Sequence, residues 1–142
     1  MNSTNKAIAT KFDPHHFPVR VYYEDTDAGG VVYHANYLKF AERARTELLR
    51  ENGHNQRDLL AEHHVYLVVR HLEAEYKAPA RLDDLIDVET EFVNLGAASV
   101  TAKQILRRDA VILAEIKTVI VSVTPEGKVA RLPPQLRQIF GR

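Results

Sequence analysis

The chain has 142 residues, of which 45% are hydrophobic and 27% are charged. This length and composition fit one globular domain, and they exclude disorder and a membrane helix, because no apolar run approaches the roughly 20 residues that a membrane span needs. The 19 basic and 19 acidic residues balance, so no net field favours nucleic acid, and the absence of cysteine excludes disulfides and thiolate catalysis.

The N-terminal residues 1–15 carry one short, weakly apolar patch and no signal-peptide pattern. We predict that they form a flexible tail before a single domain of residues 16–142, in a protein of the cytoplasm. A strand-like run from Val19 to Tyr23 then leads into an acidic turn with two glycines, which reads EDTDAGG from Glu24 to Gly30.

A long helix is predicted from about Ala35 to Asn52. Apolar residues recur in it at spacings of three and four, which gives one buried stripe: Tyr37, Phe40, Ala44 and Leu48. Gly53 follows directly and can supply the left-handed conformation that ends a helix. A shorter helix is predicted from Gln56 to Glu62, and Pro133-Pro134 can open another near the C-terminus.

The second half of the chain alternates with a period of two, which indicates strands. A bulge near Arg70-His71 reconciles a change of parity in the first of them, and the last has apolar residues on both faces, as a central strand would. The predicted strands are Val65–Tyr76, Ile86–Phe92, Val100–Leu106 and Ile112–Val123. Their short links favour an antiparallel sheet. The class is therefore α+β, either a curved sheet around one helix or a two-layer sandwich.

The turn before the long helix combines three features of an acyl-transfer site. Gly29 and Gly30 allow a ligand to approach the main chain, and the helix start offers unpaired N–H groups and a partial positive charge. Asp27 could attack a carbonyl carbon or activate water. Acidic residues and glycines before a helix also serve as turns and caps without any chemistry, and this simpler reading stays open.

Other clusters give weaker signals. Asp25 and Asp27 could form a metal-binding pair, but no further ligand has a clear spacing, and we expect no metal. The pairs His15-His16 and His63-His64 do not chelate naturally, because adjacent strand residues point to opposite faces. Arg107-Arg108 with Lys103 could grip a phosphate, although ordinary solvated charges are the favoured reading.

The segment RVYYEDTDAGGVVYHANYLKFAERARTELL closely resembles the signature of the 4-hydroxybenzoyl-CoA thioesterase family, and VVRHLEAEYKAPARLDDLIDVETE strengthens the likeness. The chain is most similar to the subfamily of acyl-CoA thioesterases associated with the Tol-Pal cell-envelope system. The resemblance spans about Phe17 to Leu132. It implies the hotdog fold, in which a long central helix is wrapped by a curved antiparallel sheet of about five strands.

The resemblance also implies the site and the reaction. The family's catalytic aspartate falls on Asp27, and the helix amide that polarises the thioester carbonyl falls at His34. The tyrosine and histidine that accompany the aspartate in the subfamily fall on Tyr23 and His34. The implied activity is hydrolysis of acyl-CoA to free acid and CoA. Basic residues that bind CoA in the hydroxybenzoyl-specific members have no match in Asn94–Ser99, so phosphate contacts stay unassigned.

The implied partners are an acyl-CoA substrate or an acyl carrier protein thioester, and a second copy of the chain in a homodimer or homotetramer. No cofactor, nucleic acid or membrane insertion is expected. The alternative function is a non-catalytic hotdog module that binds an acyl carrier or an envelope-system partner. A dehydratase or hydratase on the same fold is a more distant alternative.

Overall fold

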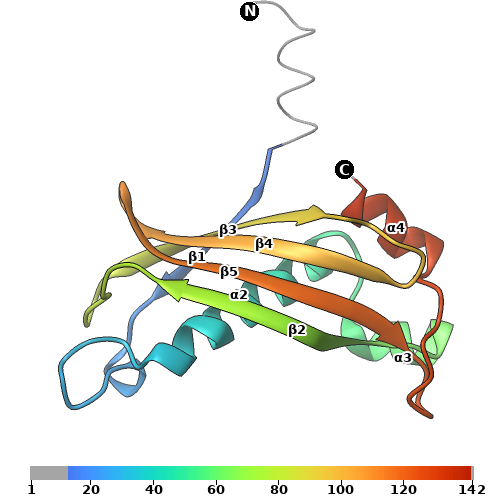
Figure 1. Ribbon diagram of the computed structural model, residues 1–142, viewed down its shortest axis with the longest axis horizontal. Coiled ribbons are helices and arrows are strands. Elements are labelled where there is room, and N and C mark those ends of the chain that lie inside the picture. The colour runs from blue at the N-terminus through green and yellow to red at the C-terminus, as the bar shows by residue number, and fades with distance from the viewer. Residues whose placement is uncertain (1–12, 142) are drawn as a thin grey trace, which may run out of the picture.

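The computed structural model describes residues 13–141. In chain order the elements are β1 (His15–Arg20), the 3-10 turn η1 (Tyr23–Asp25), α2 (His34–Glu51), α3 (Gln56–His63), β2 (Tyr66–Tyr76), β3 (Leu85–Val93), β4 (Ser99–Arg108), β5 (Val111–Val123) and α4 (Pro134–Phe140). Figure 1 shows α2 lying against one face of the sheet, with α3 and α4 near the end where α2 stops. The predicted order of one strand, a long helix and four strands is confirmed.

The strands form one antiparallel five-stranded sheet in the order β1-β3-β4-β5-β2. The register of β2 on β5 shifts between Val69 and His71, as the predicted bulge requires. The strand β5 lies between β4 and β2, which is the central position predicted for it. The strand β2 forms one edge of the sheet and the shorter β1 forms the other.

The first strand differs from the prediction. Pairing with β3 ends at Arg20, and the Tyr22 N–H donates to the Asp25 carboxylate at 2.8 Å, which folds residues 23–25 into a turn instead of extending the strand to Tyr23. A tail is predicted for residues 1–15. Residues 1–12 of it lie outside the described residues, and its last residue, His15, begins β1.

The end of α2 follows the prediction. Gly53 has a φ of 86°, a left-handed value that costs glycine little. The Gly53 N–H donates to the Arg50 carbonyl at 3.0 Å, and the His54 N–H donates to the Leu49 carbonyl at 2.9 Å. These two bonds form the Schellman motif, which satisfies carbonyl groups that the helix end leaves unpaired.

Two apolar clusters fill the space between α2 and the sheet. One lies under the first half of α2 and includes Tyr37, Phe40, Val88, Leu106 and Ile116. The other lies under its last turns, beneath α3 and α4, and includes Leu48, Leu59, Ala102, Ile120 and Leu136. Burial of this apolar surface holds the helix on the sheet and thereby fixes where the helix starts.

A layer of polar residues separates the two clusters. Arg45 lies between Ala44 and Leu48 on α2, Gln104 between Leu106 and Ala102 on β4, and Thr90 and Thr118 take the equivalent places on β3 and β5. All four residues are buried. The Arg45 guanidinium donates to Gln104 Oε1 at 3.0 Å, and Gln104 Nε2 donates to the Ala41 carbonyl and to Thr90 Oγ1, each at 2.9 Å.

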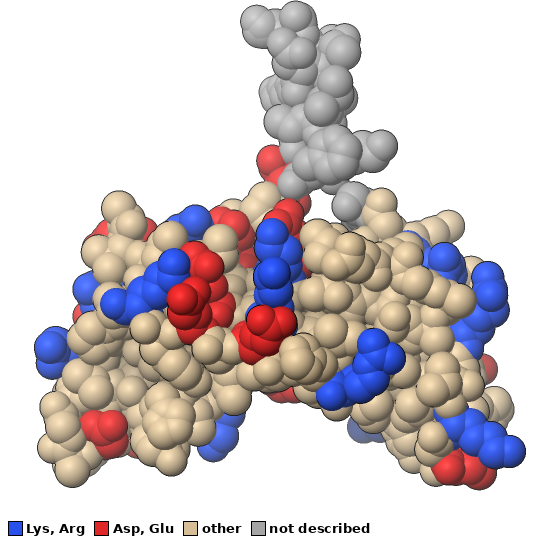
Figure 2. All heavy atoms as spheres, in the orientation of Figure 1, with Lys and Arg blue, Asp and Glu red and all other residues tan. Residues whose placement is uncertain are grey.

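The opposite face of the sheet is open and carries both signs of charge. Figure 2 shows basic and acidic side chains interspersed over this face. Lys103 on β4 lies 3.8 Å from Glu91 on β3, and Lys77 lies 3.3 Å from Glu115 on β5. Such exposed pairs contribute little to stability, and their mixture gives no single-signed field. In the described part of the chain, no helix has the length and hydropathy to cross a membrane.

Candidate active site

The segment 26–32 forms a tight loop that carries Asp27. The Asp27 N–H donates to the Val31 carbonyl at 2.9 Å, and the Gly30 N–H donates to the Asp27 carbonyl at 3.0 Å. Gly30 has a φ of 81°, so a side chain there would be strained even though the space around it is open. The sequence of the loop therefore selects a narrow turn with Asp27 at its beginning.

The Asp27 carboxylate is held at one oxygen only. Its Oδ1 accepts the Gly29 N–H at 2.8 Å, and a Cβ on Gly29 would lie 3.3 Å from this oxygen. Its Oδ2 accepts no hydrogen bond from residues 13–141, and Asp27 is exposed. One oxygen thus fixes the direction of the carboxylate while the other stays available to a substrate or a water molecule.

The preceding acid has a structural role. Asp25 is buried, and its carboxylate accepts the Tyr22 N–H. The Asp25 carbonyl accepts the Tyr33 N–H and the Asn36 side-chain amide, each at 2.9 Å. These bonds tie the acidic turn to the start of α2. Turn formation and capping therefore account for Asp25. They do not account for Asp27, because one of its carboxylate oxygens takes no part in them. Residues 13–141 contain no cluster of acidic or histidine side chains suited to a metal ion.

The start of α2 has unpaired donors. Tyr33 is the N-cap residue and makes no side-chain capping bond, while its carbonyl accepts the Asn36 N–H at 2.8 Å. The N–H groups of His34 and Ala35 donate to no acceptor within the described chain. Together with the helix dipole, these two N–H groups make a position where negative charge on an oxygen is stabilised.

The three residues that the sequence proposes are not joined by hydrogen bonds. Nothing in the described residues links Asp27 to His34 or Tyr23 through a side-chain bond. Tyr23 is 83% exposed, and within residues 13–141 its only hydrogen bonds are accepted by its backbone carbonyl, from the N–H and hydroxyl of Thr26. His34 is exposed at the first position of α2. Asp27 and His34 belong to one continuous loop and helix start, whereas Tyr23 lies earlier in the chain, in the 3-10 turn η1.

Aromatic rings surround His34. The ring centroids of Tyr33 and His34 are 4.6 Å apart, and the ring of Tyr76 lies 6.0 Å from His34 and 5.5 Å from Tyr37. The Tyr76 hydroxyl donates to the His34 carbonyl at 3.0 Å. Tyr37 is buried and its hydroxyl accepts the Ala80 N–H; burial raises the pKa of Tyr37, so it remains a neutral phenol.

Sequence reasoning missed Tyr76 as part of this region. Tyr76 is the last residue of β2, and in the sequence it only continues the alternation of apolar and polar residues that indicates a strand. Its partner His34 is 42 positions earlier in the chain. No local spacing reports such a contact, because it depends on how α2 lies across the sheet.

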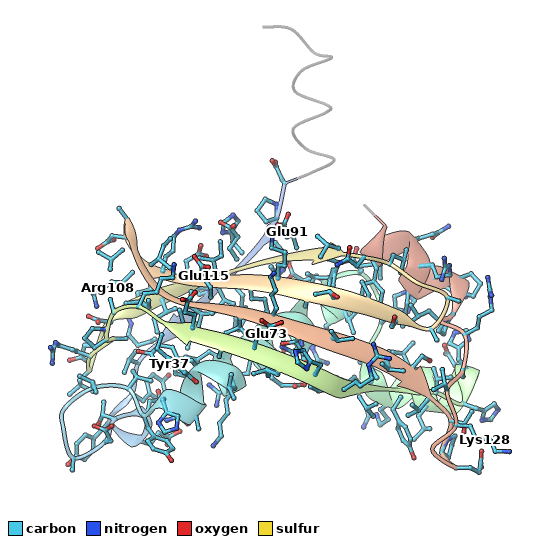
Figure 3. The ribbon with its side chains drawn as sticks, in the orientation of Figure 1. Tyr37, Glu73, Glu91, Arg108, Glu115 and Lys128 are labelled. Carbon is cyan, nitrogen blue, oxygen red and sulfur yellow. The ribbon has the colours of Figure 1, made fainter. Side chains whose placement is uncertain are left out.

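The link between β2 and β3, residues 77–84, supports the site loop. Val32 donates its N–H to the Ala80 carbonyl at 2.9 Å, and Val31 forms a β-bridge with Arg81. Arg108, at the end of β4, donates to the Pro79 carbonyl at 3.0 Å and to the Asp84 carboxylate at 2.9 Å. Figure 3 shows Arg108 and Tyr37 at the same end of the molecule, far from Lys128. Arg108 therefore has a structural partner, and Arg107 pairs with Glu89.

The Asp84–Arg108 pair makes a prediction about pH. Partial burial opposes ionisation of Asp84, but the Arg81 N–H and the Arg108 guanidinium outweigh it, so the pKa of Asp84 lies below its ordinary value. The carboxylate then stabilises the fold fully above the unfolded pKa of about 3.9, and this contribution disappears as the pH falls through the lower folded pKa. We expect Asp84→Asn to lower the free energy of unfolding by about 1 kcal/mol near neutral pH.

Urea unfolding of both proteins over a pH series, at one protein concentration, measures this difference. The gap between wild type and Asp84→Asn should narrow as the pH falls below about 4. If the difference in free energy of unfolding stays constant over the whole pH series, the charge of the Asp84 carboxylate is not its cause.

Comparison with known proteins identifies the class of protein. Residues 29–114 match the model of the thioesterase superfamily, and the chain belongs to this family. Its sheet and central helix are the hotdog fold of that family, which confirms what the family resemblance of the sequence implies.

Individual relatives agree. The acyl-CoA thioester hydrolase YbgC of Escherichia coli O6:H1 is 50% identical over 110 residues, which are 77% of this chain and 81% of the relative. The acyl-CoA thioesterase YbgC of Haemophilus influenzae is 47% identical over 126 residues, 87% of this chain and 92% of the relative. The crystal structure of a probable thioesterase from Bartonella henselae is 39% identical with a TM-score of 0.82, and the match covers 84% of this chain and 99% of that one.

Proposed function

We propose that the protein is an acyl-CoA thioester hydrolase that releases a free acid and CoA. The observation that carries this proposal is the pairing, in one short segment, of a carboxylate with a free oxygen and a helix start with unpaired N–H groups. Two relatives that match most of their length are named as acyl-CoA thioesterases, which supports the same substrate class.

In the proposed reaction, the carbonyl oxygen of the thioester accepts a hydrogen bond from the free N–H groups at His34 and Ala35. These donors stabilise the negative charge that develops on the oxygen when the carbonyl carbon is attacked. Removal of a single donor of this kind typically costs about 10²–10³ in turnover. The geometry of the helix start therefore matters as much as the carboxylate.

Asp27 supplies the attack in one of two ways. Its free oxygen can bond to the carbonyl carbon, so that the carbon–sulfur bond breaks, CoA leaves as thiolate, and water cleaves the resulting mixed anhydride. Alternatively Asp27 takes a proton from the water that attacks. His34 is proposed to orient the water or thioester and to shuttle a proton. Tyr23 is proposed to contact the substrate from the 3-10 turn η1.

The experiment that tests the function is thiol release from short-chain, long-chain and aromatic acyl-CoAs by the purified wild-type protein. We expect turnover on at least one of these classes, and the relative kcat/KM values would define the acyl preference. Absence of turnover on all of them by folded protein would reject the proposal and favour carrier-protein thioesters or the non-catalytic module. The Tol-Pal association and the cytoplasmic location stay predictions.

We also propose a homodimer formed through the free edge of β2. This strand has 11 residues, and among the described residues it has no neighbouring strand on one side. Four of its apolar or aromatic residues are exposed: Val68 39%, Val69 48%, Leu72 36% and Tyr76 45%. A long apolar edge is a template for pairing with another strand. The other edge, β1, has six residues and contains Pro18.

Sedimentation velocity tests this assembly. We expect a particle of twice the mass of one chain, or four times if dimers pair again, and Val69→Lys should shift it toward the monomer by placing charge on the edge. A wild-type protein that sediments as a monomer at micromolar concentration contradicts the proposal.

A further inference from the structure

Tyr76 is the only residue outside the site loop and α2 whose side chain donates a hydrogen bond to the first residue of that helix, within residues 13–141. Its hydroxyl lies 3.0 Å from the His34 carbonyl oxygen. Its ring meets the His34 ring edge-on, at 84°, and packs against Tyr37 at 62°. The ring is therefore fixed between two rings of α2, although 45% of the residue is exposed.

The acceptor of this bond belongs to the same peptide unit as a free donor. The carbonyl of His34 and the N–H of Ala35 are the two ends of one planar peptide group. This N–H has no acceptor in the described chain, and in the proposed reaction it faces the thioester oxygen. A hydrogen bond accepted by a carbonyl polarises its peptide group, so the N–H at the other end becomes a better donor. A carbonyl has two lone pairs, so it can accept the hydroxyl in addition to a helical N–H.

We propose that Tyr76 is a positioning residue for the thioesterase reaction, which strengthens and orients the Ala35 N–H as an oxyanion donor through its bond to the His34 carbonyl. The inference rests on the proposed function, and it adds a residue that lies on β2 and not in the site loop. Tyr76 does not itself touch the thioester. A merely structural role would instead hold the end of β2 against α2 and act on stability.

The test is Tyr76→Phe, which removes the hydroxyl and keeps the ring. Tyr22→Phe is the matched control, because Tyr22 is 62% exposed and its hydroxyl donates no hydrogen bond to the described residues. We expect kcat of Tyr76→Phe to fall about tenfold, as the loss of one neutral hydrogen bond allows, with KM and the melting temperature little changed. The Ala35 amide resonances in a ¹H–¹⁵N spectrum should shift, and Tyr22→Phe should change neither readout.

The proposal is overturned if kcat of Tyr76→Phe equals that of wild type, or if the Ala35 amide resonances do not move. It is also overturned if kcat falls only in proportion to a loss of folded protein. Wild-type protein without thiol release would reject the proposed function, whereas the Ala35 amide shift would still report whether the hydroxyl acts on this peptide group. The two failures are therefore distinguishable.

Discussion

Asp27→Asn should retain the fold and lower kcat for the preferred acyl-CoA by about 10²–10⁴-fold, the range that a catalytic base or nucleophile supplies. Asparagine keeps a side-chain oxygen that can accept the Gly29 N–H, so the turn that closes at Gly30 is preserved. It lacks the carboxylate whose free oxygen attacks the carbonyl or accepts a proton from water. The measurement is steady-state thiol release, with circular dichroism to verify folding.

Glu24→Gln is the matched control for this experiment. Glu24 is an exposed carboxylate in the same acidic turn, and its side chain makes no hydrogen bond or ion pair in the described chain. The same change of carboxylate to amide should leave kcat within about twofold of the wild-type value, since an exposed unpaired charge contributes little to the energy of the site. If kcat falls equally in Asp27→Asn and Glu24→Gln, the total negative charge of the turn is the cause, and Asp27 has no specific catalytic role.

Much of the fold was predictable because its determinants are local. The apolar stripe of α2, the left-handed Gly53 and the alternation in β3 and β5 each depend on neighbours within a few residues. The bulge at Arg70 was readable from a change of parity along one strand. The position of Asp27 before a helix start was equally local, since His34 lies only seven positions further along the chain.

The rest of the site depends on contacts between distant segments. The support of Val32 by Ala80, the bond from Arg108 to Asp84, and the contact of Tyr76 with His34 all join residues that only the folded sheet brings together. Period and spacing carry no information on such pairs. The different roles of Asp25 and Asp27 also needed the structure, because only burial separates two acids of one turn.

The largest loss of stability is expected from a substitution in the polar layer of the core. Gln104→Leu should lower the free energy of unfolding by about 3–5 kcal/mol, because three groups lose their partner and each buried polar group left unsatisfied costs about 1–3 kcal/mol. Gln104 is 1% exposed and joins three groups: the Arg45 guanidinium, the Ala41 carbonyl and the Thr90 hydroxyl. Leucine would fill a similar volume and satisfy none of them. Burial lowers the pKa of Arg45, because a charge is costly to hold away from water.

Arg45→Met in the same background tests whether the lost partner is the cause. Methionine removes the buried charge and keeps an apolar chain, and Glu42, the other partner of Arg45, is exposed enough to be solvated. We expect Arg45→Met with Gln104→Leu to be more stable than Gln104→Leu alone, by about 1–3 kcal/mol, because residues in one network couple. Urea unfolding at a fixed protein concentration, with comparison of m values, measures Gln104→Leu, Arg45→Met alone and the double variant. If the two losses simply add, the guanidinium is not held by Gln104, and the layer owes its stability to packing.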